Sequence, residues 1–304
     1  MEMKTDILEY IYRKYPQQKK KIEKNFAETK GMQDALEEFL QTYDYFLKAN
    51  SLTYEDLAEA YLWIVEQVFY YRKIFIQTGR YPHNSAQEAI SDVYNNNEIM
   101  KKYMLGLALS QFLWRQHYLV FEFYRSEIKN IEPNTRLLEI GSGHGLFSLE
   151  ALKYIDHIEI FDIIDISDTS LEMSKSIINM LKPRALSIIN FYKQDVNLFK
   201  PSTKYDLIIM GEVLEHVEDP LALLTDIYSL LRDDGQLFIT TCANCPTIDH
   251  IYYFESIESI KDMINIAGFE IIREVIIPSE NISHERLLKM KVDISYAAML
   301  KRMK

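Results

Sequence analysis

The chain has 304 residues, which is enough for one large or two medium domains. Its formal net charge of −11 argues against nucleic-acid binding, because phosphate contacts supply most of the affinity in such complexes. Two cysteines exclude a disulfide framework, and no apolar run has the length of a membrane span, so we expect a cytoplasmic protein that binds no membrane.

The first 130 residues are predicted to be helical. Apolar residues recur with helical spacing over residues 32–47, and Thr53 opens a second helix that is predicted to end near Gly79. A shorter helix is expected over residues 85–94, followed by one long and almost continuously apolar helix over residues 97–129. Such a helix must be buried on most sides, against other helices or a partner subunit.

Residues 1–130 are therefore predicted to form a helical cap and substrate domain, with a possible homodimer contact through these helices. Aromatic side chains with polar tips suit, as a group, a pocket for a small substrate, although ordinary packing is the better explanation for each of them taken singly. Three neighbours on the last helix are predicted to bind the substrate, with Arg115 opposite an acidic group: Trp114, Arg115 and His117.

An apolar run that begins at Leu137 ends in an acid, Glu139, and is followed by Gly141, Gly143 and Gly145. Glycine lets the backbone approach a ligand closely, and open α/β folds bind nucleotides at this edge of the sheet. The dinucleotide fingerprint requires a different third glycine position, and Glu139 would repel a pyrophosphate but attract a cation. The sequence therefore predicts a cofactor with a nucleoside and a positive charge.

The acid-x-Gly-x-Gly-x-Gly pattern resembles the first motif of the class I S-adenosylmethionine-dependent methyltransferases. The later segments follow the order of that family: a strand that ends in Asp165, twenty residues beyond Gly145, a strand followed by Asp195, and a strand that runs into Gly211. The resemblance implies an α/β, Rossmann-like sheet of seven strands over residues 131–304, mostly parallel with an antiparallel last strand. It also implies that S-adenosyl-L-methionine is bound by Glu139, Gly141, Gly143, Gly145, Asp165, Ile166, Asp195, Val196 and Gly211.

Methyl transfer needs a general base only for an acceptor that must lose a proton, such as a hydroxyl group. In the loop after the fifth strand, His250 is the first candidate for the base or for an acceptor ligand, and a packing role is equally open. His216 and Glu212, after the fourth strand, are the other catalytic candidates. Asp249 and Tyr253, in the same loop as His250, are predicted to bind the acceptor.

No metal is part of the main prediction. Cys242 and Cys245 have the spacing of metal ligands, but a structural zinc site normally needs two such pairs. The loop also vaguely resembles that of methyltransferases that use a metal to methylate 2-oxo acids at carbon, with Asp249, His250 and His284 as candidate ligands.

The leading prediction is an S-adenosylmethionine-dependent methyltransferase that acts on oxygen, nitrogen or carbon of a small natural-product or amino-acid-derived metabolite. Two alternatives stay open: the metal-assisted C-methyltransferase of a 2-oxo acid, and a non-catalytic protein that binds the cofactor for sensing or scaffolding.

Overall fold

The computed structural model describes residues 2–83, 85–280, 282 and 284–303, and it leaves the side chains of residues 2–5, 284, 285 and 288 undescribed. Within this part of the chain, seven strands form one sheet in the order β3-β2-β1-β4-β5-β7-β6. Strands β1 to β5 are parallel, whereas β7 is antiparallel to both of its neighbours, β5 and β6. The predicted fold class is confirmed. The strands are β1 Thr135–Ile140, β2 Ile158–Asp165, β3 Ile189–Lys193, β4 Tyr205–Gly211, β5 Leu231–Ala243, β6 Phe269–Pro278 and β7 Ile294–Arg302.

The sheet is buried on both faces because its strands carry apolar residues at successive positions. Leu137 faces one core, which it shares with helices on the α8 side, and Leu138 faces a second core on the α10 side. This alternation follows from the two-residue period of a strand. The flanking elements are α8 Leu146–Tyr154, α9 Asp168–Leu181, η2 Pro183–Ile188, η3 Val196–Leu198, η4 Leu214–His216, α10 Pro220–Leu230, α11 Ile257–Ile266 and α12 His284–Lys289.

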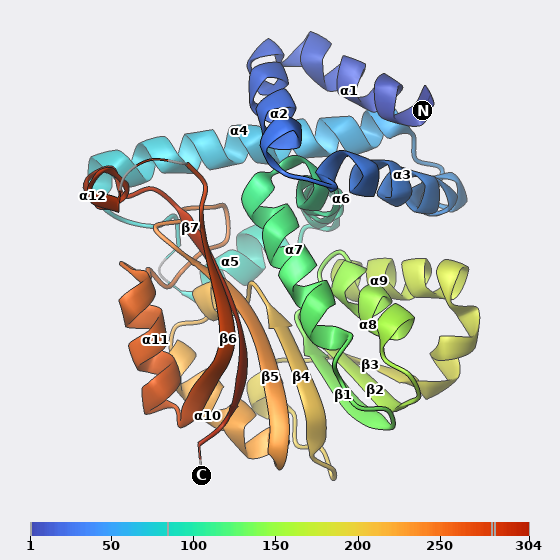
Figure 1. Cartoon of the computed structure of the whole chain (residues 1–304), viewed down its shortest axis with the longest axis vertical. Helices are drawn as coiled ribbons and strands as arrows, with labels where there is room; N and C mark the ends of the chain where they lie inside the picture. The colour runs from blue at the N-terminus through green and yellow to red at the C-terminus, as the bar shows by residue number, and fades with distance from the viewer. Residues whose placement is uncertain (1, 84, 281, 283, 304) are drawn as a thin grey trace.

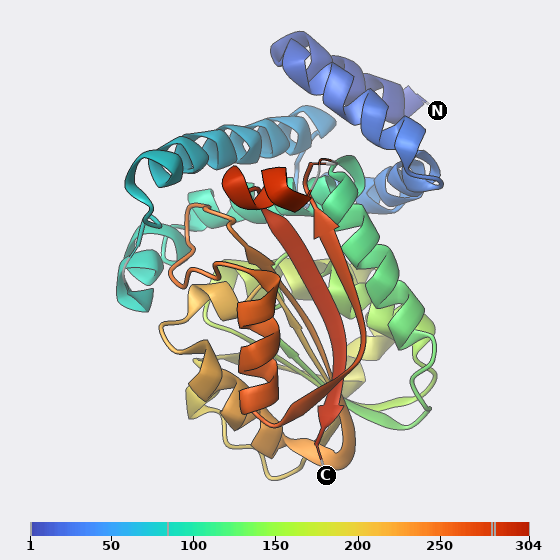
Figure 2. The same cartoon turned by 60° about the vertical axis from the view of Figure 1, so that its left-hand side comes forward.

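Most of the helices that precede β1 lie across one end of the sheet, where α4 crosses the molecule, while α7 runs down beside the strands (Figures 1 and 2). The capping box at Thr53 is present, since its side chain accepts from Asp56 N and the Asp56 carboxylate accepts from Thr53 N. The same helix ends at Gly79, whose φ of 68° suits glycine. These elements are α1 Glu2–Lys14, α2 Pro16–Glu28, α3 Met32–Ala49, α4 Tyr54–Thr78, α5 Ala86–Ala89, η1 Ile90–Tyr94, α6 Asn97–Leu113 and α7 Arg115–Ile128.

The prediction of a single helix over residues 97–129 is wrong. Trp114 has an extended backbone, with φ −101° and ψ 123°, and separates α6 from α7. Its indole nitrogen donates to the Tyr61 hydroxyl at 3.0 Å, which fixes the break against α4. Helix α6 then packs on α4, whereas α7 runs down along β6 and β7 (Figure 1). Two buried helices in succession give the same unbroken apolar pattern as one, so the sequence did not show the break.

One apolar core continues from the N-terminal helices into the sheet, so the boundary predicted at residue 130 stays a prediction. Among the described residues, no helix combines the length and the hydropathy that crossing a membrane requires.

Candidate functional site

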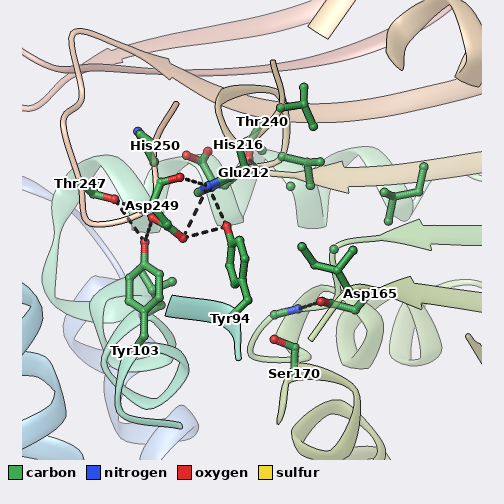
Figure 3. Close-up of a pocket in the computed structure, with 18 of the residues that line it drawn as sticks. Tyr94, Tyr103, Asp165, Ser170, Glu212, His216, Thr240, Thr247, Asp249 and His250 are labelled. Carbon is green, nitrogen blue, oxygen red and sulfur yellow. Dashed lines mark hydrogen bonds and ion pairs between the residues drawn. The ribbon is translucent and has the colours of Figure 1, made fainter. Parts of the chain in front are cut away.

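A cavity of about 520 Å³ lies at the carboxyl ends of β1, β2, β4 and β5. Helices α4 and α6 cover it with apolar side chains, among them Ile64, Met104 and Leu107. Figure 3 shows Asp165 at one end of this space and Tyr94, Tyr103, His216 and Asp249 at the other. We call these the glycine end (Gly141, Gly143 and Asp165) and the Asp249 end (Tyr94, Tyr103, His216, Thr247 and Asp249).

The glycine end is formed mainly by backbone. Gly141, Gly143 and Gly145 all have positive φ, of 74°, 48° and 75°. A Cβ atom at Gly143 would lie 3.4 Å from Met104 Sδ, in the space between the turn and the cap. Gly145 is not part of the cavity wall, because it packs against Ser174 of α9, whose Cα would lie 2.9 Å from an added Cβ.

Asp165 ends β2 and lines the cavity although its side chain is largely buried. One carboxylate oxygen accepts from Ser167 N at 2.8 Å and the other from Gly143 N at 3.3 Å. Burial raises the pKa of Asp165, and these hydrogen bonds oppose that shift. A fixed carboxylate beside an open glycine turn fits the ribose of an adenosyl cofactor. The remaining predicted residues that line the wall here are Ile166, Asp195, Val196 and Gly211.

Glu139 lies behind the glycine turn and is not part of the cavity wall. Strand alternation turns its side chain toward α8, where its carboxylate accepts a hydrogen bond from the Ser148 hydroxyl. Burial raises the pKa of Glu139 to about 8, so the carboxyl group is largely protonated near neutrality. The Glu139 side chain therefore does not face the cofactor space, and the direct attraction to a cofactor cation that the sequence suggested has no support in the structure.

At the opposite end, the Asp249 carboxylate accepts three hydroxyl hydrogen bonds. Tyr94 donates to Oδ2 at 3.0 Å, and Tyr103 and Thr247 each donate to Oδ1 at 2.9 Å. Burial alone would raise the pKa of Asp249, but His216 and His250 nearby, together with the hydroxyl donors, hold it below its usual value. The cap and the loop after β5 thus meet at one buried, ionised carboxylate (Figure 3).

His216 is oriented by the same group of residues. Its Nδ1 lies 3.1 Å from the backbone oxygen of Asp249, 3.5 Å from the Asp249 carboxylate and 3.0 Å from the Tyr94 hydroxyl. A proton on Nδ1 that is donated to Asp249 leaves the lone pair of Nε2 available to accept another proton. Glu212 is exposed at the cavity wall and has a positive φ of 51°.

His250 also lines the cavity, but it is 4% exposed and its Nδ1 has no hydrogen-bond partner among the described residues. Burial, with His216 as the next cause, lowers the pKa of His250 to about 3. An imidazole of such low basicity is a poor proton acceptor, and His216 is the one whose Nδ1 is held by Asp249 and Tyr94, so His216 is favoured over His250 as a base. The side chain of His284, at the start of α12, lies outside the described part of the chain.

Of the other predicted substrate residues, Trp114 and His117 line the cavity and Arg115 and Tyr253 do not. Arg115 is the first residue of α7 and leaves the wall because the chain changes direction at Trp114. The Tyr253 hydroxyl donates to Asn244 Oδ1 at 2.8 Å, so it supports the loop rather than facing the cavity.

Sequence reasoning missed Tyr94, Tyr103, Thr247 and His144 as wall residues. His144 stood within the glycine turn and could have been noticed; burial lowers its pKa to about 4. The two tyrosines belong to the helical cap. Tyr94 precedes Asp249 by 155 positions in the sequence, and Tyr103 precedes it by 146. No local pattern links residues at that distance.

Comparisons with known proteins agree with this geometry. A family model described as a methyltransferase domain matches residues 113–274. Malonyl-(acyl-carrier protein) O-methyltransferase 1 of Ilyobacter polytropus is 32% identical over 127 residues, which are 42% of this chain and 43% of that protein. Ubiquinone biosynthesis O-methyltransferase of Coxiella burnetii is 33% identical over 106 residues, 34% of this chain and 42% of that protein.

The chain thus spans less than half of the length of these two curated relatives. A crystal structure described as a candidate sarcosine dimethylglycine methyltransferase from Galdieria sulphuraria has a TM-score of 0.50 at 14% sequence identity. That match covers 62% of this chain and 86% of the other one, and it shows a shared fold.

Proposed function

The chain belongs to the class I S-adenosylmethionine-dependent methyltransferases, and from this premise we propose that it methylates an oxygen atom of a small metabolite. S-adenosylmethionine is the cofactor of this family, and the glycine end is the part of the cavity that fits it. Two of the relatives are named O-methyltransferases, which supports oxygen as the methylated atom.

The observation that carries this proposal is that one continuous cavity connects the glycine end with the Asp249 end. Its volume of about 520 Å³ lies within the usual range for small-molecule sites, roughly 300–1,000 Å³. A donor at one end and an acceptor at the other would meet inside a space that α4 and α6 cover. Alignment and exclusion of water supply much of the acceleration in a displacement of this kind.

The residues of this chain then have distinct tasks. Asp165 would hold the ribose hydroxyls, and the glycine turn would let the backbone approach the cofactor closely. When bound, the cofactor supplies an activated methyl group. His216, held through Nδ1 by Asp249 and Tyr94, would take the acceptor proton on Nε2. Asp249 is a positioning residue, since its carboxylate and backbone oxygen fix the orientation of His216.

The test is to incubate the purified chain with S-adenosylmethionine and a panel of small hydroxyl and carboxyl compounds. Release of S-adenosylhomocysteine identifies an acceptor, and mass spectrometry of the product locates the methyl group. The substitution His216→Asn should then lower turnover by about 100-fold or more and leave cofactor affinity unchanged.

His157→Asn is the matched control, because His157 is exposed in the turn before β2 and its φ of 56° is one that asparagine tolerates. This variant should turn over at the wild-type rate. Cofactor binding by the wild-type chain without release of S-adenosylhomocysteine for any acceptor would contradict the proposal and favour a sensing or scaffolding role.

A further inference from the structure

Beside the Asp249 end, the cavity wall contains a cluster of soft and nitrogen ligands that the proposed mechanism does not use. Cys242, Cys245 and His250 all line the cavity, and one potential ligand atom from each lies within 4.8 Å of the others. Tetrahedral zinc holds its sulfur and nitrogen ligands about 3.3–3.8 Å apart, so a small contraction would complete the coordination of an ion.

The local backbone explains why the two thiols converge. Cys242 lies near the end of β5, and Cys245 follows after Asn244, whose φ is +56°. This left-handed residue turns the chain so that both sulfur atoms lie on one side. Asn244 is held by its own N–H, which donates to Phe254 O at 3.0 Å, and by its carbonyl, which accepts from Arg72 at 3.0 Å. The pair of thiols is therefore positioned before any ligand binds.

Two polar atoms in the same place form no hydrogen bond with the described residues: His250 Nδ1 and Glu215 Oε1. Both side chains are almost fully buried, with exposed fractions of 4% and 1%. His250 Nε2 lies 4.0 Å from Glu215 Oε1, while the other oxygen of Glu215 accepts from the Thr241 hydroxyl at 2.7 Å. A buried polar group without a partner is costly, so a ligand that satisfies the imidazole is expected here.

We propose that Cys242, Cys245 and His250 bind a zinc ion whose fourth coordination position opens on the cavity. Two thiolates and an imidazole are the ligands that zinc prefers, and a site with three protein ligands is typical of zinc that also binds a substrate or water. Glu215 is not part of the cavity wall and lies behind the imidazole, where its carboxylate would accept a hydrogen bond from the nitrogen that does not bind the ion.

The role of the ion in binding an acceptor rests on the proposed methyltransferase function. The open position faces the space assigned to the acceptor, so the ion would coordinate a hydroxyl or carboxylate oxygen of the molecule to be methylated. Coordination would fix the acceptor atom near His216, since the rings of His216 and His250 are 4.8 Å apart (Figure 3).

The test is a titration of the reduced, chelator-treated full chain with Co²⁺, which replaces zinc and reports its ligands by absorption. We expect thiolate-to-cobalt charge-transfer bands together with the intense visible bands of tetrahedral cobalt, saturating at a single site per chain and abolished by added zinc. Cys245→Ser and His250→Asn should each remove or markedly weaken these bands. His117→Asn, which alters a half-buried histidine in another part of the cavity wall, should retain them.

A reduced wild-type chain without charge-transfer bands would overturn the inference, as would bands that survive both ligand substitutions. Circular dichroism and S-adenosylmethionine affinity show whether a variant that loses the bands is still folded. Turnover is measured on the same wild-type samples. Turnover without cobalt absorption bands would contradict the zinc site and support the proposed methyltransferase activity. Normal cobalt bands without turnover would support the zinc site and contradict the proposed activity.

Discussion

At the glycine end, the groups that face the cavity belong to one short turn and the residue that ends the next strand, whereas at the Asp249 end they are side chains from four separate segments. Gly141 and Gly143 contribute backbone, and Asp165 is held by backbone N–H groups. Tyr94, His216 and Asp249 instead hold one another through side chains from η1, η4 and the loop after β5. The first end depends on local geometry and the second on how the cap is seated on the sheet.

This difference predicts that the two ends can be disabled separately. Substitutions at the glycine end should affect cofactor affinity, and substitutions at the Asp249 end should affect turnover without affecting that affinity.

The largest effect is expected from Asp249→Asn. In the wild type, the Tyr94 and Tyr103 hydroxyls donate to the Asp249 carboxylate, and an amide would place an N–H₂ donor opposite one of them. The substitution would also remove the negative charge beside His216. We expect turnover to fall by about 100-fold or more, with S-adenosylmethionine affinity unchanged in calorimetry. Asp262→Asn, on the exposed side of α11, is the control and should behave as the wild type. A parallel loss of cofactor affinity would show that the two ends are not independent.

The substitution Glu139→Gln tests whether the acid before the glycine turn binds the cofactor or stabilises the folded chain. Burial raises the pKa of Glu139 to about 8, so its stabilising contribution is complete below the ordinary glutamate pKa and is lost as the pH rises through about 8. Between about pH 5 and about pH 8.5 the wild type should therefore lose on the order of 3 kcal/mol more unfolding free energy than the glutamine variant.

Urea denaturation at the two pH values measures this difference. Glu172→Gln, at an exposed carboxyl on α9, should not change the pH dependence. If glutamine at position 139 instead weakens cofactor binding strongly and leaves the pH dependence of stability intact, the charge interaction inferred from the sequence is correct and the structural role is not.

A smaller effect is expected from Asp165→Ala, the one substitution that removes a side-chain ligand from the glycine end. It should weaken S-adenosylmethionine binding by about 1.5–3 kcal/mol, because a charge-assisted hydrogen bond to the ribose is lost. Turnover at saturating cofactor should change less than affinity does. Asp168→Asn, at an exposed residue of α9, serves as the control. An unchanged dissociation constant in calorimetry would assign the ribose contact to another residue.

The same contrast explains what the sequence could predict. The capping box at Thr53 and the turn at Gly141 depend on neighbours in sequence, and the structure contains both. The mostly parallel sheet of seven strands was implied by the family resemblance, and it is present as well. Trp114 escaped prediction because a bend between two buried helices leaves the apolar pattern unbroken. Asp249 could be named as a candidate, but its partners Tyr94 and Tyr103 could not, since only the packing of η1 and α6 over the sheet brings them together.

The smallest effect, and the sharpest comparison within the Asp249 end, comes from two matched tyrosines. The Tyr94 hydroxyl donates to Asp249 and also lies 3.0 Å from His216 Nδ1, whereas the Tyr103 hydroxyl reaches Asp249 and Thr247. Each phenylalanine variant keeps the ring and removes one hydroxyl, at a cost of about 0.5–1.5 kcal/mol. If His216 is the base, Tyr94→Phe should lower turnover by up to about tenfold, with a smaller effect for Tyr103→Phe. Rates measured with one acceptor at saturating cofactor decide this, and an equal loss in both variants would mean that Asp249 itself, rather than its orientation of His216, determines the rate.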